Sequence, residues 1–280
     1  MQGAQAAERG ALFKVSGGGH TMHLFGTMHV GLAEFYPLEP RIRAAVAAAP
    51  ILALEIDPLA DPASMLTAIR THAMLAPDAK GYQDQAPAAR KRIEKALVQA
   101  GIDPVAVARF KPWLVATTLA LAEYAGMGYR ADQSVDMHLA QMARAANVKV
   151  IALETVEGQL GMFDSLNTDE QWRFLDESIG LIESGRQKKE VRDIVEAWSR
   201  ADKAGLDAIA LRAENDMSVS GRFIQNVMLD QRNVPLADKL AALLARENHA
   251  VAAVGVLHLL GAKSIPALLR AKGLTVERIY

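Results

Sequence analysis

The sequence predicts an α/β protein in which a central mixed β-sheet is flanked by helices and carries a largely helical insertion. Short apolar segments bounded by glycine or proline recur between longer helical patterns, which indicates buried strands joined by helices. A glycine-rich turn links the first two segments and predicts an antiparallel hairpin, whereas helices separate the later segments and predict parallel strands. The chain has 280 residues, of which 51% are hydrophobic, so it can build a large core.

The N-terminal region predicts a hairpin followed by a β-α-β unit. The turn Gly17–Gly19 separates the predicted strands Leu12–Val15 and Thr21–Phe25. An amphipathic helix over Leu38–Ala49 stops before a proline, and the strand Ile51–Ile56 follows. This order and length are typical of a right-handed crossover between parallel strands.

A helical insertion is predicted over residues 63–131. This region has no convincing strand but contains helical patterns over Ala86–Ala100 and Trp113–Tyr124. A helical segment placed over a strand edge often forms a lid or a wall of a substrate site. His72 falls within the insertion, where we expect a packing or surface residue.

The second half continues the alternation of helices and strands. A helix over Asp132–Ala146 leads into the strand Val148–Leu153, and Arg232-Asn233 separates two predicted helices near the C-terminus. The expected single domain covers residues 11–280, after a disordered start over residues 1–10. Its remaining predicted elements are the helices 168–185, 191–204, 206–214, 218–230, 235–246 and 264–271 and the strands 250–254 and 274–279.

Composition excludes several classes of function. The chain has no cysteine, which rules out disulfides and thiolate chemistry, and its 31 basic and 32 acidic residues form no basic block that would favour nucleic acid. No apolar stretch is long enough for a membrane helix, so we expect a peptide or a small molecule as partner. Ala4-Gln5-Ala6 resembles the end of a cleaved leader, although an ordinary alanine-rich start is equally compatible with it.

Two distant segments share one motif and supply the first candidate site residues. Met22–His29 and Val251–His258 are apolar runs followed by glycine, two residues and histidine. We expect each glycine to let the backbone turn sharply, which places His29 and His258 just beyond the strands. Chance can also produce such spacings, and isolated histidines are often satisfied structurally. The related spacing at His20 lies in the hairpin turn and receives no chemical role.

Two further predicted strands end in carboxylates, Glu55 and Glu154. In open α/β sheets, ligands bind beyond the carboxyl ends of the strands, so two histidines and two glutamates could share one edge. His29 and Glu55 would be neighbours if their strands are adjacent. Imidazole and carboxylate ligands are typical of a catalytic divalent metal, which suggests a hydrolase. Arg232 stands at a predicted helix boundary, where it could enter the site or remain on the surface.

Several motifs occur together in an order that resembles the TraB/GumN family, which includes the Tiki-type metalloproteases. The resemblance extends from about Phe13 to Tyr280. The family usually has Gly-aliphatic-Asp before the middle helix, where this chain has Ser134-Val135-Asp136. The resemblance rests on the motifs Phe13–Ser16, Leu24–Gly31, Leu52–Glu55, Lys111–Trp113, Leu153–Thr155 with Gln159, Gln231–Asn233 and Val254–Gly261.

The resemblance implies a fold shared with the erythromycin-esterase-like and ChaN-like proteins. It also implies a divalent-metal site, for Mn²⁺, Co²⁺ or Zn²⁺, formed by His29, His258 and Glu55. Glu55 is either a ligand or the general base. Glu154 would complete the coordination or orient a histidine, and Arg232 would stabilise an oxyanion or bind a substrate carboxylate. Asp136 is either an extra ligand, a partner of a histidine, or an acid that serves the helix dipole.

The expected function is therefore a metal-dependent hydrolase, most specifically a metallopeptidase. An esterase or lactone hydrolase is the alternative within the same chemistry, and a haem, metal or peptide carrier is the alternative outside it. A serine hydrolase is disfavoured because the sequence has no G-x-S-x-G motif. Export is frequent in the family, so the resemblance favours a periplasmic or secreted protein, with a cytoplasmic location left open, as is the oligomeric state.

Overall fold

The computed structural model describes residues 7–280 of the protein. The leader-like Ala4-Gln5-Ala6 and most of the expected disordered start lie outside these residues. Arg9 and Gly10 lie within them and are bonded to the rest of the chain. The Gly10 N–H donates to the Trp198 carbonyl oxygen at 2.6 Å, and the Arg9 guanidinium donates to the carbonyls of Glu34 and Phe35.

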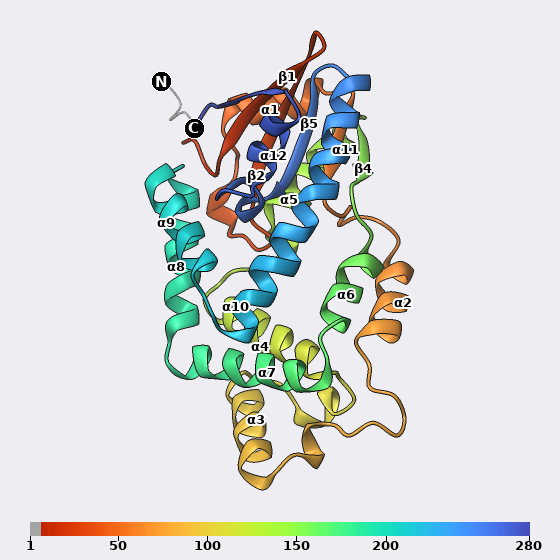
Figure 1. The fold of residues 1–280 in the computed structure, drawn as a ribbon, viewed down its shortest axis with the longest axis vertical. Coiled ribbons are helices and arrows are strands. Elements are labelled where there is room, and N and C mark those ends of the chain that lie inside the picture. The colour runs from red at the N-terminus through yellow and green to blue at the C-terminus, as the bar shows by residue number, and fades with distance from the viewer. Residues whose placement is uncertain (1–6) are drawn as a thin grey trace.

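Within residues 7–280 the strands form one six-stranded mixed sheet in the order β4-β3-β5-β2-β1-β6. The four strands β4, β3, β5 and β2 are parallel, whereas β1 is antiparallel to both β2 and β6. The α/β fold class with a mixed sheet is confirmed (Figure 1). The strands are β1 Leu12–Gly17, β2 His20–Thr27, β3 Ile51–Leu54, β4 Lys149–Ala152, β5 Ala250–Gly255 and β6 Thr275–Arg278.

The strand order corrects one expectation about neighbours. The strands that precede His29 and Glu55 are β2 and β3, and they do not pair with each other. Instead β5 lies between them, with Leu24 paired to Ala252 on one side and Ala53 paired to Ala252 on the other. Because β5 lies between β2 and β3, the end of β5 places His258 between the ends of the strands that carry His29 and Glu55.

Helices cover both faces of the sheet and form a second layer beyond its carboxyl edge. In Figure 1, α1 and α5 lie behind the sheet and α11 and α12 in front of it, while α4 and α7 lie below the strand ends. The helices are α1 Pro40–Ala48, α2 Pro62–His72, α3 Pro87–Gln99, α4 Pro112–Gly126, α5 Val135–Ala145, α6 Val156–Asp164, α7 Thr168–Glu183, α8 Arg186–Ser199, α9 Lys203–Glu214, α10 Val219–Phe223, α11 Arg232–Arg246 and α12 Ile265–Ala271.

Most helices agree with the sequence prediction, but three do not. The helix α2 lies almost entirely within the expected helical insertion but was not itself predicted. The helix α6 was not predicted, because its glycines at 158 and 161 weaken the helical pattern. The helix α8 starts at Arg186 and ends at Ser199, several residues earlier than expected, because Gly185 at φ +71° starts a new helix directly after α7.

A larger correction concerns Arg232, which was expected at a break between two helices. The chain instead continues through α10, a π-helical segment over Ile224–Gln231, and α11 without a break. Pro235 gave the appearance of a helix start, since proline is typical of the first helical turn. The change from π- to α-helical bonding lies just before Pro235, which has no amide hydrogen to bond to the preceding turn.

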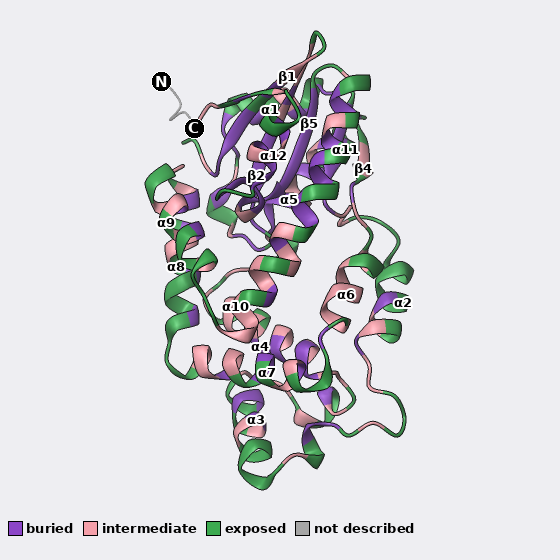
Figure 2. Cartoon of the chain, viewed as in Figure 1, coloured by how far each residue is buried: buried purple, intermediate pink, exposed green. Residues whose placement is uncertain are grey.

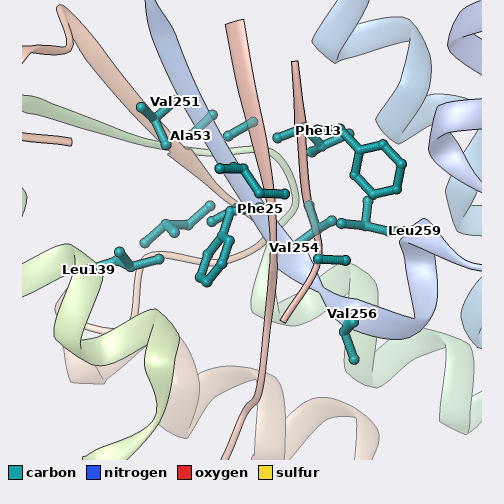
Figure 3. Packing of buried hydrophobic residues seen from close by; sticks show 14 of the residues in the cluster. Phe13, Phe25, Ala53, Leu139, Val251, Val254, Val256 and Leu259 are labelled. Atoms are coloured by element: carbon teal, nitrogen blue, oxygen red, sulfur yellow. The ribbon is translucent and has the colours of Figure 1, made fainter. Parts of the chain in front are cut away.

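Two hydrophobic clusters hold the structure together. The larger cluster contains the sheet and the helices on its two faces, and Figure 3 shows Phe13, Phe25 and Leu139 among its members. The smaller cluster lies among the helices beyond the strand ends and is built around Trp113, which is 1% exposed. Figure 2 shows the buried strands surrounded by helices that are exposed on their outer faces.

The helices described over residues 7–280 include none with the length and apolar character needed to cross a membrane.

Candidate functional site

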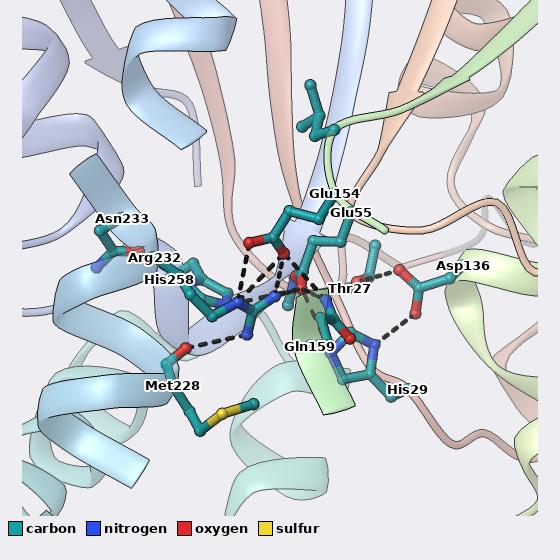
Figure 4. Close-up of polar contacts among 12 residues, drawn as sticks. Thr27, His29, Glu55, Asp136, Glu154, Gln159, Met228, Arg232, Asn233 and His258 are labelled. Atoms are coloured by element: carbon teal, nitrogen blue, oxygen red, sulfur yellow. Dashed lines mark hydrogen bonds and ion pairs between the residues drawn. The ribbon is translucent and has the colours of Figure 1, made fainter. Parts of the chain in front are cut away.

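The carboxyl ends of the four parallel strands bring the predicted site residues together. His29 follows β2, Glu55 follows β3, Glu154 follows β4, and His258 lies in the short helical turn after β5. Figure 4 shows these side chains converging around Glu55. The Nε2 atoms of His29 and His258 lie 4.0 and 3.7 Å from the two carboxylate oxygens of Glu55.

Glu55 is the buried centre of this arrangement, with only 4% of its surface exposed. Its Oε1 accepts a hydrogen bond from the Gly255 N–H at 2.5 Å, and its Oε2 accepts one from Nη2 of Arg232. Burial opposes ionisation, but the two histidines, the Arg232 guanidinium and the Gly255 N–H together lower the pKa of Glu55 to about 2. The side chain is therefore a carboxylate at neutral pH.

His258 is held as a neutral imidazole. Its ring is 3% exposed, and burial lowers its pKa to about 4, with the Glu55 carboxylate opposing this shift. Nδ1 lies 2.6 Å from Oδ1 of Asn233. Since an amide oxygen only accepts, Nδ1 carries the hydrogen and Nε2 has a free lone pair. That lone pair faces the ionised Glu55, so two acceptors meet across a gap suited to a proton or a cation.

His29 has the opposite preference. Nδ1 lies 2.9 Å from Oδ2 of Asp136, whose Oδ1 accepts from the Thr27 hydroxyl at 2.7 Å. Desolvation lowers the pKa of His29, but the Asp136 carboxylate outweighs it and raises the pKa to about 9. The side chain is 64% exposed although it stands beside the buried Glu55, so it forms the open side of the site. Of the roles open to Asp136, the structure shows the contact with a histidine.

The two motif glycines provide space rather than sharp turns. Gly255 has φ −50° and ψ 135°, and neither Gly26 nor Gly255 has a positive φ, so the expectation of a glycine-specific turn was wrong. A Cβ at Gly255 would lie 3.0 Å from Nε2 of His29 and 3.3 Å from Oε1 of Glu55. A Cβ at Gly26 would lie 2.9 Å from a Val256 methyl group. Glycine at 255 therefore leaves room for His29 and Glu55, and glycine at 26 leaves room for Val256.

Arg232 lies inside the site and not on the surface, with 5% of its area exposed. Its Nη2 binds Glu55 and also Oε2 of Glu154 at 2.5 Å, while Nε lies 3.2 Å from both oxygens of Glu154. Nη1 donates to the Met228 carbonyl at 3.0 Å, within the π-helical segment. These contacts make Arg232 a link between two carboxylates, whereas the expected contact with an oxyanion would need a guanidinium that faces the substrate.

Glu154 does not reach either histidine through a hydrogen bond. Its partners are Arg232 and the Gln159 amide, whose Nε2 donates to Oε2 of Glu154 at 3.0 Å and approaches Oε2 of Glu55 at 3.5 Å. The expected roles of Glu154, completing the coordination or orienting a histidine, therefore have no direct contact in this structure. Glu154 instead fixes the side of Arg232 that faces α6.

Ser134 stands where the resemblance to the family predicts a glycine. It is the N-cap of α5, and its hydroxyl accepts a hydrogen bond from the Met137 N–H at 3.2 Å. Serine and glycine are both acceptable N-cap residues. Asp136 then falls in the first turn of the helix, where its charge also suits the helix dipole.

The two imidazoles and the carboxylate are suitable ligands for a divalent cation, but their nitrogen and oxygen atoms lie farther apart than the ligands of one cation. No group of three or more potential ligand side chains within residues 7–280 has metal-site geometry. The gaps of 3.7 and 4.0 Å between Glu55 and the two Nε2 atoms exceed the separation of about 3.4 Å between two ligands of a tetrahedral metal at ~2.1 Å. His258 offers a free lone pair, and His29 must release its proton first.

Three residues at the site had no role in the sequence prediction. Asn233 fixes the tautomer of His258, and Gln159 joins Glu154 to Glu55. Both belong to motifs recognised in the sequence, so their proximity in the chain to Arg232 and Glu154 could have indicated a role at the site. Lys239, whose ammonium donates to the Leu153 carbonyl, belongs to no motif and carried no signal in the sequence.

Comparison with known proteins finds distant relatives over most of the chain. The chain is 26% identical to the Uncharacterized protein YbaP of Escherichia coli (strain K12) over 257 residues, which cover 90% of this chain and 89% of that protein. The same identity and coverage hold for the protein of that name in Shigella flexneri. No solved structure matches the chain. The sequence matches the TraB/PrgY/gumN family over residues 11–278, and the protein therefore belongs to that family.

Proposed function

We propose that this protein is a metal-dependent hydrolase and that peptides are its substrates. The observation that carries the proposal is the pair of Nε2 atoms, from His29 and His258, that face the two oxygens of one buried carboxylate, Glu55. Two imidazoles and a carboxylate are a ligand set of hydrolytic zinc and manganese sites. Membership in the TraB/PrgY/gumN family supports the same class of chemistry.

Each residue of the site has its own role in this proposal. His29, His258 and Glu55 would hold the cation, which when bound polarises the scissile carbonyl and acidifies the attacking water. Asn233 and Asp136 hold the two imidazoles by their Nδ1 atoms, so both Nε2 atoms turn toward Glu55. A pKa of about 2 suits Glu55 to the role of ligand more than to that of base, since a general base works best with a pKa near the working pH.

Arg232 and Glu154 support Glu55 through the ion pairs of Arg232. The Arg232 guanidinium pairs with both Glu55 and Glu154 and bridges them, so it holds Glu55 in place without touching the substrate. The open side of the site lies at His29, whose side chain is 64% exposed. Substrate would enter there. A haem carrier is disfavoured, because Nε2 of the 3% exposed His258 faces a carboxylate at 3.7 Å, where a porphyrin iron would need to lie.

The decisive experiment measures metal and cleavage in the same samples. Chelator-treated protein is reloaded with Mn²⁺, Co²⁺ or Zn²⁺, and its metal content is compared with that of the His29→Ala, His258→Ala and Glu55→Gln variants. Each sample is incubated with a mixed peptide library and a panel of esters, and products are identified by mass spectrometry. We expect one cation per chain, lost in the variants, with peptide cleavage that follows metal occupancy.

A matched control is the exposed His249, which lies at φ +62° on the opposite edge of the sheet. His249→Asn removes an imidazole and suits this backbone conformation, so metal content and cleavage should not change. Cleavage of esters but not of peptides would show that the protein is an esterase and not a peptidase. Full turnover by a folded His29→Ala, His258→Ala double variant would overturn the hydrolytic role of this site.

A further inference from the structure

A pocket of about 440 Å³ lies against Glu154 and Gln159 at the end of β4. Its wall is formed by Glu154 and Gln159, both of which are bonded within the site, together with Ala152 at the end of β4 and Met162 of α6. The volume lies within the range of about 300–1,000 Å³ that small-molecule sites occupy. The pocket thus shares Glu154 and Gln159 with the network around Glu55 and is large enough for part of a substrate.

One cation lines this pocket, Lys239 of α11. It lies seven residues after Arg232, so both side chains leave the same face of the helix toward the strand ends. Arg232 is fully engaged by Glu55 and Glu154. Lys239 forms no ion pair with any carboxylate of residues 7–280, and its ammonium donates to the Leu153 carbonyl. An ammonium has three hydrogens, so two remain for another acceptor.

Gln159 offers the complementary group. Ionised Glu154 and Glu55 only accept hydrogen bonds, so the amide nitrogen of Gln159 must face them and its Oε1 must face the other way. The side chain lines the pocket, and its Oε1 accepts no hydrogen bond from any of residues 7–280. Such an oxygen suits a backbone N–H of an extended peptide.

We propose that this pocket selects substrates that carry a carboxylate on one side of the scissile bond, with Lys239 as its cationic partner and Gln159 as the acceptor for the peptide N–H. The proposal rests on the proposed hydrolase for the cleavage itself, while recognition of the carboxylate depends only on the pocket. Arg232, which contacts both oxygens of Glu154 and also pairs with Glu55, offsets only part of the negative charge beside the pocket, so Lys239 supplies the cation for the substrate. The carboxylate can come from an Asp or Glu side chain or from the end of a peptide.

Binding and cleavage are tested separately with Ala-based hexapeptides that carry one Glu or one Gln at each position in turn. Each peptide is made with an amidated and with a free C-terminus, which distinguishes side-chain from terminal carboxylates. Binding to chelator-treated protein is measured by calorimetry, and cleavage by metal-loaded protein is measured by mass spectrometry. We expect at least one acidic peptide to bind and to be cleaved about tenfold better than its neutral counterpart, ~1.4 kcal/mol of selectivity.

The variants isolate the charge of Lys239. Lys239→Gln keeps a donor for the Leu153 carbonyl and should remove the acidic preference, whereas Lys239→Arg should retain it and Lys239→Glu should reverse it. Lys263→Gln is the matched control, since Lys263 is a 72% exposed lysine paired with Asp230 outside the pocket. Its binding preference should equal that of the wild type.

The outcomes separate this inference from the proposed function. Peptide cleavage with equal rates for Glu and Gln peptides, unchanged in Lys239→Gln, would overturn the carboxylate pocket and leave the hydrolase standing. Lys239-dependent binding of acidic peptides by a protein that cleaves nothing would support the pocket and overturn the hydrolase. Wild-type protein that binds no member of the series would show that Lys239 only caps the end of β4.

Discussion

The two histidines of the site bind protons with opposite preferences although both face Glu55. His258 is buried against an amide oxygen and stays neutral, whereas His29 is open to solvent and paired with the Asp136 carboxylate. Burial lowers the pKa of His258 to about 4, whereas the Asp136 carboxylate outweighs desolvation and raises the pKa of His29 to about 9. Nε2 of His258 therefore has a free lone pair, whereas His29 carries an extra proton at neutral pH.

Asp136→Asn should bring the pKa of His29 from about 9 toward its ordinary value of 6.5. Because this pKa is raised in the folded protein, the His29–Asp136 pair stabilises the fold fully below pH 6.5, and this contribution disappears as the pH rises through about 9. Imidazole NMR titration of chelator-treated protein checks the shift. A His29 resonance that titrates near 6.5 in the wild type would show that the pair is not formed.

Gly255→Ala should damage the site without damaging the fold. The backbone at φ −50° and ψ 135° accepts alanine, but the new Cβ would lie 3.0 Å from Nε2 of His29 and would displace the ring. We expect metal affinity to fall by about tenfold or more, ~1.4 kcal/mol. A metal titration measures the affinity, and circular dichroism checks that the variant is folded.

Gly126→Ala is the control for this substitution, because a Cβ there meets no atom within 4 Å. Its metal affinity should equal that of the wild type. An unchanged affinity in Gly255→Ala would show that His29 can move aside or that it does not bind the cation.

At the scale of elements, a single arginine ties α11 to the ends of β3 and β4. Arg232 can reach both carboxylates because the helix is continuous through its π-helical segment, which also leaves the Met228 carbonyl available to Nη1. π-Helical turns within α-helices occur frequently at functional sites. The irregular segment thus places the guanidinium beneath Glu55 and Glu154.

Removing this cation should be costly for the fold. Arg232→Ala leaves two adjacent carboxylates without their partner in a site where Glu55 is 4% exposed, and breaking a buried pair in this way costs about 3–5 kcal/mol. Adding Glu154→Gln to Arg232→Ala should recover part of that loss, since one uncompensated charge disappears. Urea unfolding of the single and double variants measures both effects.

Arg246→Ala provides the comparison for a solvent-exposed arginine at the end of the same helix. Its hydrogen bond is to the Ala242 carbonyl, and a change within about 0.5 kcal/mol is expected. A similarly small effect for Arg232→Ala would mean that water already screens the two carboxylates.

At the scale of the whole molecule, the site lies where the sheet cluster meets the helical cluster built around Trp113. The two histidines and Glu55 come from the sheet side, whereas α6 contributes Gln159 and continues to Asp164, which pairs with Lys111 at the start of α4. The helix α6 therefore links the strand ends to the helical layer. A cation that draws His29 and His258 toward Glu55 joins segments that are more than 200 residues apart in the chain.

Cation binding should consequently raise the stability of the entire chain. A cation at 100 times its dissociation constant stabilises the folded state by about 2.7 kcal/mol, which corresponds to a rise in Tm of roughly 5–10 °C for a chain of this size. Thermal unfolding of chelator-treated protein with and without Mn²⁺, Co²⁺ or Zn²⁺ measures the shift. His258→Ala should show none, and an equal shift in that variant would place the cation elsewhere.

The sequence by itself determined the fold class, most strands and helices, and the residues His29, Glu55, Glu154 and His258 at strand ends. These features depend on local pattern, because apolar runs, glycines and caps act over a few residues. The helix α6 escaped prediction for the same reason, since its glycines weaken the local pattern. The motif order also indicated the family.

Only the tertiary structure decided how those strand ends meet. Insertion of β5 between β2 and β3 depends on pairing across more than 190 residues, which no local pattern records. The same holds for Asn233 on His258, for Arg232 between two carboxylates, and for Lys239 at the pocket, since each contact joins segments that are distant in sequence. Local patterns selected the residues, and long-range packing assigned their partners and hence their protonation.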